Sequence, residues 1–372
     1  MSIRRYLTSA IITALASLPM ASFGDADALV KRLLTPPEIK PADGFSARLL
    51  VAPGKLYDPL IMLPVGDTTW INDDGGEEKD KGSRLLAISH SGEISVLADV
   101  GKLLPTVGFD LAPASFGDYG GDVFTLAQPK VAVAGGLENH VVQRLEPDND
   151  FAASIYCTLP ETGPKKISGF GLDARFGPEG SPFAGRLFVV TILNDAIYQV
   201  TADGKCEPFL VFDGETYSGP TVMNFTPDGQ RMLVSVSRGV FSLESTGPQA
   251  GAIVTVSADG KIDAEPLYAG ASKPTGMAYA PADFGPYGGQ LFFADIGRFQ
   301  IPVPMTQKLD TDGRVFRIDA DGKPAVVATD LVNPIGVQFV NGKLWVADIN
   351  GDFIAGRREL PDGFIVEFDI AR

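Results

Sequence analysis

The chain has 372 residues, a formal net charge of −15, 42 Gly, 28 Pro, and only two Cys and two His. Nucleic-acid binding needs a clustered basic surface, which 31 Lys and Arg spread among 46 Asp and Glu do not make. The scarcity of Cys and His also argues against a zinc cluster or a Cys–His nucleophile.

The first 24 residues have the features of a secretory signal peptide. Arg4 and Arg5 precede the apolar run "AIITALASLPMAS", which is too short for a settled membrane helix and ends in small residues. We expect cleavage near Gly24 and a periplasmic or secreted protein. No later segment approaches the about 18 apolar residues of a spanning helix, so we expect no membrane contact after cleavage.

Near the start of the mature chain, 25–372, "ADALVKRLL" is a candidate short helix. The segment "GFSARLLVA" from Gly44 is a candidate strand that precedes the first repeat and belongs to none. Repeats follow. Phe-Gly pairs begin at Phe116, Phe176 and Phe284, at intervals of 60 and 108 residues, the second being twice 54. Shorter forms near residues 230 and 341 fill the gaps, so the chain reads as a repeat of roughly 50 residues.

Two further markers recur in each repeat. A hinge precedes the glycine turn, as in "PTVMNFTP", "PTGMAYAP" and "PIGVQFVN", and a hairpin follows it, as in "IYQVTADGKCEPFLV" and "VFRIDADGKPAVVAT". Asp-Gly between alternating apolar runs is a strong hairpin signal. Four strands per repeat are typical of a propeller blade.

The sequence therefore predicts an all-β fold, a six-bladed β-propeller with four-stranded blades, as one domain over residues 25–372. The last repeat is one strand short, and we expect the strand after Gly44 to supply it and close the ring, which would leave no open edge. The glycines of "PADFGPYGGQLFFAD" then shape a turn of the scaffold and do not hold a phosphate. His90 falls in a hairpin turn, "SHSGE", where other repeats have Ala-Asp-Gly.

The blade pattern predicts that the hinges and the loops after each second strand share one face. Four of these loops are long, and long loops on a rigid scaffold often carry function. Asp295 and Asp348 end second strands in "FFAD" and "WVAD", and His140 begins a third strand. We therefore expect a site at the channel on the hinge face.

The units "SGPTVMNFTPDGQRMLVSVS", "KPTGMAYAP" with "GQLFFADIG", and "NPIGVQFVNGKLWVADINGD" resemble six-bladed propellers of the gluconolactonase and senescence-marker type, with the NHL-repeat and strictosidine-synthase-like propellers as relatives. The resemblance covers the mature chain at the level of architecture. It implies hydrolysis of a lactone or ester at a divalent metal such as Ca²⁺ in the channel.

Carried over residue by residue, the resemblance places the family's metal-binding glutamate at Asp58, its asparagine at Thr221 and its aspartate at Thr275. Threonines are poor replacements because hard cations favour carboxylates. Other side chains predicted on the hinge face can rebuild a metal site with Asp58: Asn194, Asp195, Asp295, Asp348, Asn350 and Asp352.

We assign candidate roles on this basis. Asp58, Asn194 and Asp195 are the candidate metal ligands, and Asp295, Asp348 and His140 are the candidate catalytic groups. The candidate substrate-binding residues are Thr221, Thr275, Arg298 and Ser168. The alternative for Asp295 and Asp348 is structural, because short polar side chains at strand ends often bind backbone N–H groups.

The predicted function is an exported, metal-dependent hydrolase of a small-molecule lactone or ester, acting as a monomer. A non-catalytic binding propeller is the main alternative, since fold does not fix function. A pyrroloquinoline-quinone sugar dehydrogenase is less favoured because basic residues are few. Cys157 and Cys206 lie on predicted outer strands of neighbouring blades; export permits a disulfide between them, and the sequence leaves its formation open.

Overall fold

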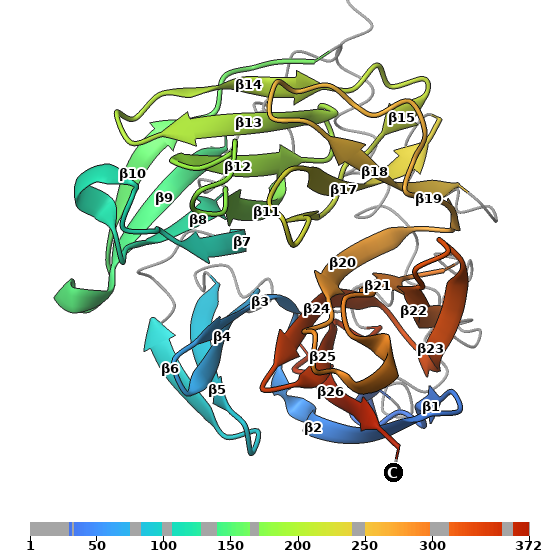
Figure 1. The fold of residues 1–372 in the computed structure, drawn as a ribbon. Coiled ribbons are helices and arrows are strands. Elements are labelled where there is room, and N and C mark those ends of the chain that lie inside the picture. Colours follow the sequence, from blue (N-terminus) through green and yellow to red (C-terminus); the bar gives the residue numbers. More distant parts are fainter. Residues whose placement is uncertain are drawn as a thin grey trace, which may run out of the picture.

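The strands form six antiparallel sheets that stand around a central axis like the blades of a fan (Figure 1). This computed structural model describes residues 30–31, 33–74, 83–98, 106–127, 140–163, 171–239, 250–297, 312–351 and 360–371. Within those ranges the predicted fold class is confirmed: the chain is a six-bladed β-propeller, nearly all β. The predicted signal peptide lies outside the described residues, as do the long loops at 75–82, 128–139, 298–311 and 352–359.

Each of the first three blades has four strands, which follow one another from the axis outward. Blade 1 holds β3 (Pro59–Val65), β4 (Thr68–Asp73), β5 (Arg84–Ser89) and β6 (Ile94–Ala98). Blade 2 holds β7 (Thr106–Leu111), β8 (Val123–Ala127), β9 (Val141–Glu146) and β10 (Ala152–Thr158). Blade 3 holds β11 (Gly171–Phe176), β12 (Arg186–Thr191), β13 (Ala196–Thr201) and β14 (Cys206–Val211).

The other three blades carry small variations. In blade 4 the inner position is divided between β15 (Tyr217–Ser218) and β16 (Met223–Phe225), followed by β17 (Met232–Arg238), β18 (Gly251–Val256) and β19 (Tyr268–Ala271). Blade 5 holds β20 (Pro274–Tyr279), β21 (Leu291–Asp295), β22 (Gly313–Ile318) and β23 (Pro324–Leu331), with β1 (Lys40–Pro41) added outside β23. Blade 6 holds β24 (Pro334–Val340), β25 (Lys343–Asp348) and β26 (Gly363–Ile370), and its outer strand is β2 (Phe45–Leu56), paired antiparallel with β26.

The core lies between the blades. Six clusters of buried apolar side chains each fill one interface between neighbouring blades, from blades 1 and 2 around to blades 6 and 1. Alternating side chains of a strand face opposite sides of its sheet, so both faces of every blade contribute to this packing. Val222 is an exception: it belongs to blade 4 but packs in the cluster between blades 1 and 2.

Buried phenylalanines in the turns after the inner strands wedge neighbouring blades together. Phe116 lies 4.8 Å from Phe176 of blade 3 between ring centroids, and Phe284 lies 4.9 Å from Phe339 of blade 6. In blade 3 the same position belongs to Phe183, 5.1 Å from Phe225 of blade 4. The match of Phe176 to Phe116 and Phe284 was therefore wrong, because Phe176 ends an inner strand and receives the wedge of the preceding blade.

A disulfide joins the outer strands of blades 2 and 3. Cys157 of β10 and Cys206 of β14 are bonded, with 6.3 Å between their Cα atoms. The Tyr156 hydroxyl beside them donates to the carbonyls of Thr201 and Ala202 of blade 3, at 3.1 and 2.9 Å. This pair of contacts fastens two blades at the rim, far from their packed inner strands.

Candidate functional site

An aspartate ends the second strand in blades 1, 5 and 6 and holds the hinge that leads into the inner strand. These residues are Asp73, Asp295 and Asp348, and each pairs in register with the hinge proline that begins the inner strand of its own blade, Pro59, Pro274 and Pro334 respectively. We call this arrangement the hinge clasp, and the end of the propeller where it lies the hinge face. Blades 5, 6 and 1 are consecutive around the ring.

The carboxylates of the clasps in blades 5 and 6 are each bound by three backbone N–H groups. Asp295 accepts from Ser272, Lys273 and Gly297 at 2.7 to 2.9 Å. Asp348 repeats the pattern with the N–H groups of Val332, Asn333 and Asn350, also at 2.7 to 2.9 Å. These bonds satisfy backbone donors that would otherwise be buried without partners.

The clasp carboxylates are well buried, with Asp295 3% and Asp348 0% exposed. Burial raises the pKa of Asp348 to about 6, against the effect of the three N–H donors. In blade 1, Asp73 accepts from the Tyr57 N–H at 2.9 Å and forms a partly buried ion pair with Arg84. The geometry gives Asp295 and Asp348 a role in holding backbone; a direct catalytic role for them stays a prediction.

The residue just before each hinge proline occupies an equivalent position in the three clasped blades. These residues are Asp58, Lys273 and Asn333. The clasps fix the backbone next to all three, so their side chains start from one level of the hinge face on consecutive blades. Burial lowers the pKa of Lys273 to about 8. Asp58 and Asn333 are 8% and 2% exposed.

Lys273 and Asn333 were missed from sequence, although a signal existed. Asp58, where the resemblance places the metal-binding glutamate, directly precedes the first hinge proline, and the same position in "SKP" and "VNP" is held by the other two. The hinge alignment instead compared the residues after the proline, which led to Thr221 and Thr275.

Thr221 and Thr275 connect neighbouring blades. The Thr275 hydroxyl donates to the Pro334 carbonyl of blade 6 at 2.7 Å, and the Thr221 hydroxyl donates to the Pro274 carbonyl of blade 5 at 3.1 Å. Thr221 also contacts the Ser235 hydroxyl at 2.6 Å. Both threonines are buried, at 6% and 3% exposed. Their hydroxyl protons are directed to backbone carbonyls; substrate binding by either residue stays a prediction.

Replacing Thr275 by Val is expected to lower the free energy of unfolding by about 1 to 2 kcal/mol, because a buried carbonyl loses its donor while side-chain volume is kept. Urea denaturation measures the change. Thr329→Val is the matched control, since that exposed hydroxyl bonds only to its neighbour Asp330. An unchanged midpoint for Thr275→Val would show that the inter-blade bond contributes nothing.

Asn194 and Asp195 lie in the tight turn between β12 and β13, and their side chains contact different parts of the molecule. The Asn194 amide donates to the Tyr198 hydroxyl at 2.7 Å and its oxygen accepts from Thr191. Asp195, with a left-handed φ of 56°, accepts from the Gly219 N–H at 2.6 Å. Both side chains serve contacts within the fold, and metal binding by either residue stays a prediction.

His140 precedes β9 and is 6% exposed. Burial lowers its pKa to about 4, so the imidazole is neutral at physiological pH.

The remaining candidates lie elsewhere. Asn350 donates to the carbonyls of Leu33 and Asp362 at 3.0 and 2.9 Å. Arg298, Ser168 and Asp352 lie outside the described residues.

The described residues do not fit a divalent cation on the hinge face. No group of three or more His, Cys, Asp or Glu side chains in the described ranges is arranged to hold a metal ion. Two of the three candidate metal ligands already serve other bonds, because the Asn194 oxygen accepts from Thr191 and Asp195 accepts from the Gly219 N–H. Ca²⁺ stays an expectation from the family resemblance.

Fold and hinge-face geometry together define a six-bladed propeller, and solved structures of several functions share that fold. A gluconolactonase from Xanthomonas campestris matches with a TM-score of 0.53 and 15% identity, over 91% of this chain and 97% of that one. A glucose dehydrogenase matches with 0.53 and 15%, over 87% and 98%. An auxiliary nutrient binding protein from Bacteroides ovatus matches with 0.53 and 10%, over 89% and 78%. At these identities the likeness shows the fold alone.

No known protein-family profile and no curated protein sequence matches the chain. In the part of the chain that the structure describes, no helix has the length and apolar character needed to cross a membrane.

Proposed function

We propose that this protein is an exported hydrolase of a small-molecule lactone or ester, with its site at the hinge-face mouth of the channel. The observation that carries the proposal is the placement of Asp58, Lys273 and Asn333 at equivalent positions of three consecutive blades. They offer a carboxylate, an amine with a pKa of about 8 and a neutral amide. The fold is one that gluconolactonases also use.

Hydrolysis of a lactone or ester needs a base for the attacking water and donors for the oxyanion. The neutral amine of Lys273 takes a proton from water as the oxygen adds to the carbonyl, and gives it to the leaving alkoxide when the carbon–oxygen bond breaks. The Asn333 amide donates to the developing oxyanion, and Asp58 accepts from a substrate hydroxyl. Asp295 and Asp348 then act as positioning residues.

The disulfide supports export. Structural disulfides form and persist in oxidising compartments and are rare in the reducing cytosol. The Cys157–Cys206 bond therefore agrees with removal of the first 24 residues and a periplasmic or extracellular location. Amino-terminal sequencing of the protein recovered from the periplasm or medium is expected to begin near Asp25.

Lys273→Met is expected to lower kcat/KM by about 100-fold or more on the substrate that the wild type turns over, the size of effect usual for a lost general base. The substrates are a panel of five- and six-membered lactones and aryl esters, with Lys205→Met, an exposed lysine, as the matched control. Wild-type kcat/KM is expected to rise with pH up to about 8 and then level, because only the neutral amine accepts a proton.

Two results would overturn this assignment. Equal kcat/KM for Lys273→Met and wild type would remove Lys273 from the chemistry. Loss of turnover with a chelator, restored by Ca²⁺, would show that a metal held by residues outside the described ranges carries the reaction.

A non-catalytic binding propeller is the second candidate, favoured by one observation. The carboxylates of Asp295 and Asp348 are each bound by three backbone N–H groups, which suits a scaffold role. No turnover on the whole panel would favour this function.

A further inference from the structure

The inner strands place one residue per blade at the same level of the channel. These residues pair with one residue of each second strand, in blade order Trp70, Phe124, Phe188, Leu233, Phe292 and Trp345. We call them the channel ring, in blade order: Leu63, Asp110, Arg175, Asn224, Ala278 and Gln338. Five of the six are partly exposed, although every inner strand lies at the centre of the molecule.

Two residues earlier along each strand, the corresponding level is buried in all six blades and closes the channel. Ile61 of blade 1 and Val222 of blade 4 lie on opposite sides of the ring and pack in one buried cluster. Blades 2, 5 and 6 have glycine here, so neighbouring strands approach closely: a Cβ on Gly336 would lie 2.2 Å from the Leu60 carbonyl oxygen. This layer separates the channel ring from the hinge-face mouth.

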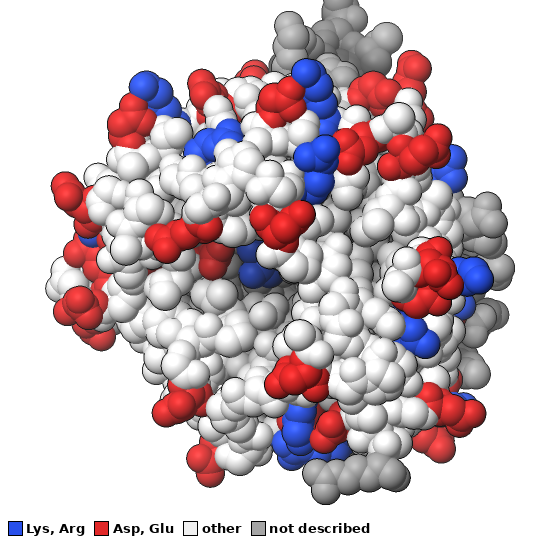
Figure 2. Space-filling model, in the orientation of Figure 1, with Lys and Arg blue, Asp and Glu red and all other residues white. Residues whose placement is uncertain are grey.

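The channel ring therefore lines a hollow that opens toward the opposite end, the turn face, where inner strands turn into second strands. Figure 2 shows the molecule hollowed at the centre of the ring, with a basic and an acidic side chain at the bottom. Arg175 is the only Lys or Arg in the six inner strands that the structure describes. Its side chain is 15% exposed.

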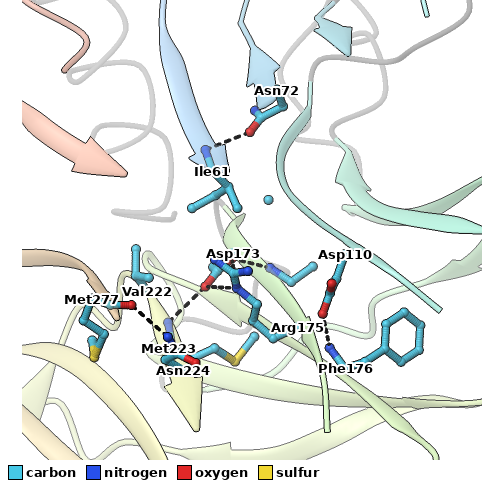
Figure 3. Close-up of polar contacts among 12 residues, drawn as sticks. Ile61, Asn72, Asp110, Asp173, Arg175, Phe176, Val222, Met223, Asn224 and Met277 are labelled. Carbon is cyan, nitrogen blue, oxygen red and sulfur yellow. Dashed lines mark hydrogen bonds and ion pairs between the residues drawn. The ribbon is translucent and has the colours of Figure 1, made fainter. Parts of the chain in front are cut away.

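Polar side chains at and just below the channel ring form hydrogen bonds between neighbouring blades (Figure 3). Asp110 accepts from the Phe176 N–H at 2.7 Å, and the Asn224 amide donates to the Met277 carbonyl at 2.8 Å. Asp173, one level deeper, accepts from the Met223 N–H at 3.0 Å and lies 3.3 Å from Arg175 Nε. The stapling carboxylates and amide retain further lone pairs that can accept hydrogen bonds.

These contacts use only one of the three nitrogens of the Arg175 guanidinium. Only its Nε is bonded, to Asp173; neither terminal nitrogen has a hydrogen-bond partner among the described residues. The Gln338 amide also has none there, and it is half-buried in the same hollow. Arginine donors that have no protein acceptor at a partly buried position are available to a ligand, because buried donors are normally satisfied.

The charges around the hollow indicate the class of ligand. Two carboxylates, Asp110 and Asp173, surround one guanidinium, Arg175, and the whole chain is acidic, so an anionic ligand would be repelled. Donors from Arg175 and Gln338 stand among acceptors from Asp110 and Asn224, while Leu63 and Ala278 offer apolar surface. Hydroxyl groups both donate and accept, so a sugar or polyol satisfies such a mixed set.

We propose that the turn-face end of the channel binds a neutral, polyhydroxylated small molecule of the monosaccharide or polyol class. The binding groups are the polar members of the channel ring. This second site lies on the far side of the Ile61–Val222 layer from the proposed catalytic mouth and does not depend on it.

Ligand-observed NMR on the full exported chain tests the proposal, with glucose, galactose, mannose, mannitol and inositol as neutral probes and gluconate as the anionic probe. At least one neutral probe is expected to bind, more tightly than gluconate. Gln338→Leu is expected to weaken it about 10-fold, the effect of about 1.4 kcal/mol. Arg175→Lys keeps the charge beside Asp173 but loses the planar fork, and is expected to weaken it at least as much.

Lys273→Met is the control, because it changes only the hinge-face mouth, and binding is expected to stay unchanged. Failure of all neutral probes, or tighter binding of gluconate, would overturn the proposal. So would binding that Lys273→Met abolishes and Gln338→Leu leaves intact, which would move the ligand to the hinge face. If Arg175→Lys does not fold, Gln338→Leu decides, since that side chain has no hydrogen bond to lose among the described residues.

Discussion

Lowering the pH from 7 to 4 is expected to lower the free energy of unfolding by about 3 kcal/mol through His140 alone. Burial holds the pKa of this imidazole at about 4 in the folded chain, against 6.5 in an unfolded one. Between these values the unfolded chain binds a proton that the folded chain excludes. Stability from His140 is therefore fully present above pH 6.5 and is lost as the pH falls toward 4.

Other buried groups act in the opposite direction, so the variant must isolate the histidine. Burial raises the pKa values of Asp348 and Asp173 to about 6, which makes their protonation below pH 6 favour the folded chain. Urea denaturation at pH 4.5 and pH 7 is compared for wild type and His140→Gln, and the variant is expected to lose less stability between the two. His90→Gln, in the turn after β5, is the matched control and is expected to behave as wild type. An equal loss in His140→Gln and wild type would contradict the assignment.

The architecture could be predicted because the same local sequence signals recur in every blade. Asp-Gly hairpin turns, hinge prolines and alternating strands recur in each blade, and a period of about 50 residues leaves few folds to choose from. The assignment of Phe176 failed because spacing alone does not say which of two nearby phenylalanines sits in the turn. Only the pairing of strands separates Phe176 from Phe183.

The candidate site was harder to predict because polar side chains on one face have several possible partners. Asp295 and Asp348 were placed correctly at strand ends, yet whether a carboxylate meets a substrate or a backbone N–H depends on the path of the hinge, which the sequence does not reveal. Lys273 acquires its character from burial, a property of the folded chain. Arg175 escaped notice because the channel ring is defined by the pairing of the inner with the second strand inside each blade, which the sequence does not show.

Loss of the disulfide is expected to be the costliest covalent change in the propeller. The bond closes a loop with a sequence separation of 49 residues, and loops of this size correspond to a stabilisation of about 2 to 4 kcal/mol. The double variant Cys157→Ser/Cys206→Ser is expected to lose that much in urea denaturation under oxidising conditions.

The same measurement in a reducing agent separates the covalent bond from packing. Wild type is expected to fall to the stability of the double variant once reduced, whereas the variant is expected to be unaffected by the reductant. If the reduced wild type keeps its full stability, the Tyr156 contacts and the buried cluster between blades 2 and 3 hold the rim without the disulfide. In that case the argument for export from this bond fails as well, because a bond without a stabilising effect gives the chain no reason to require an oxidising compartment.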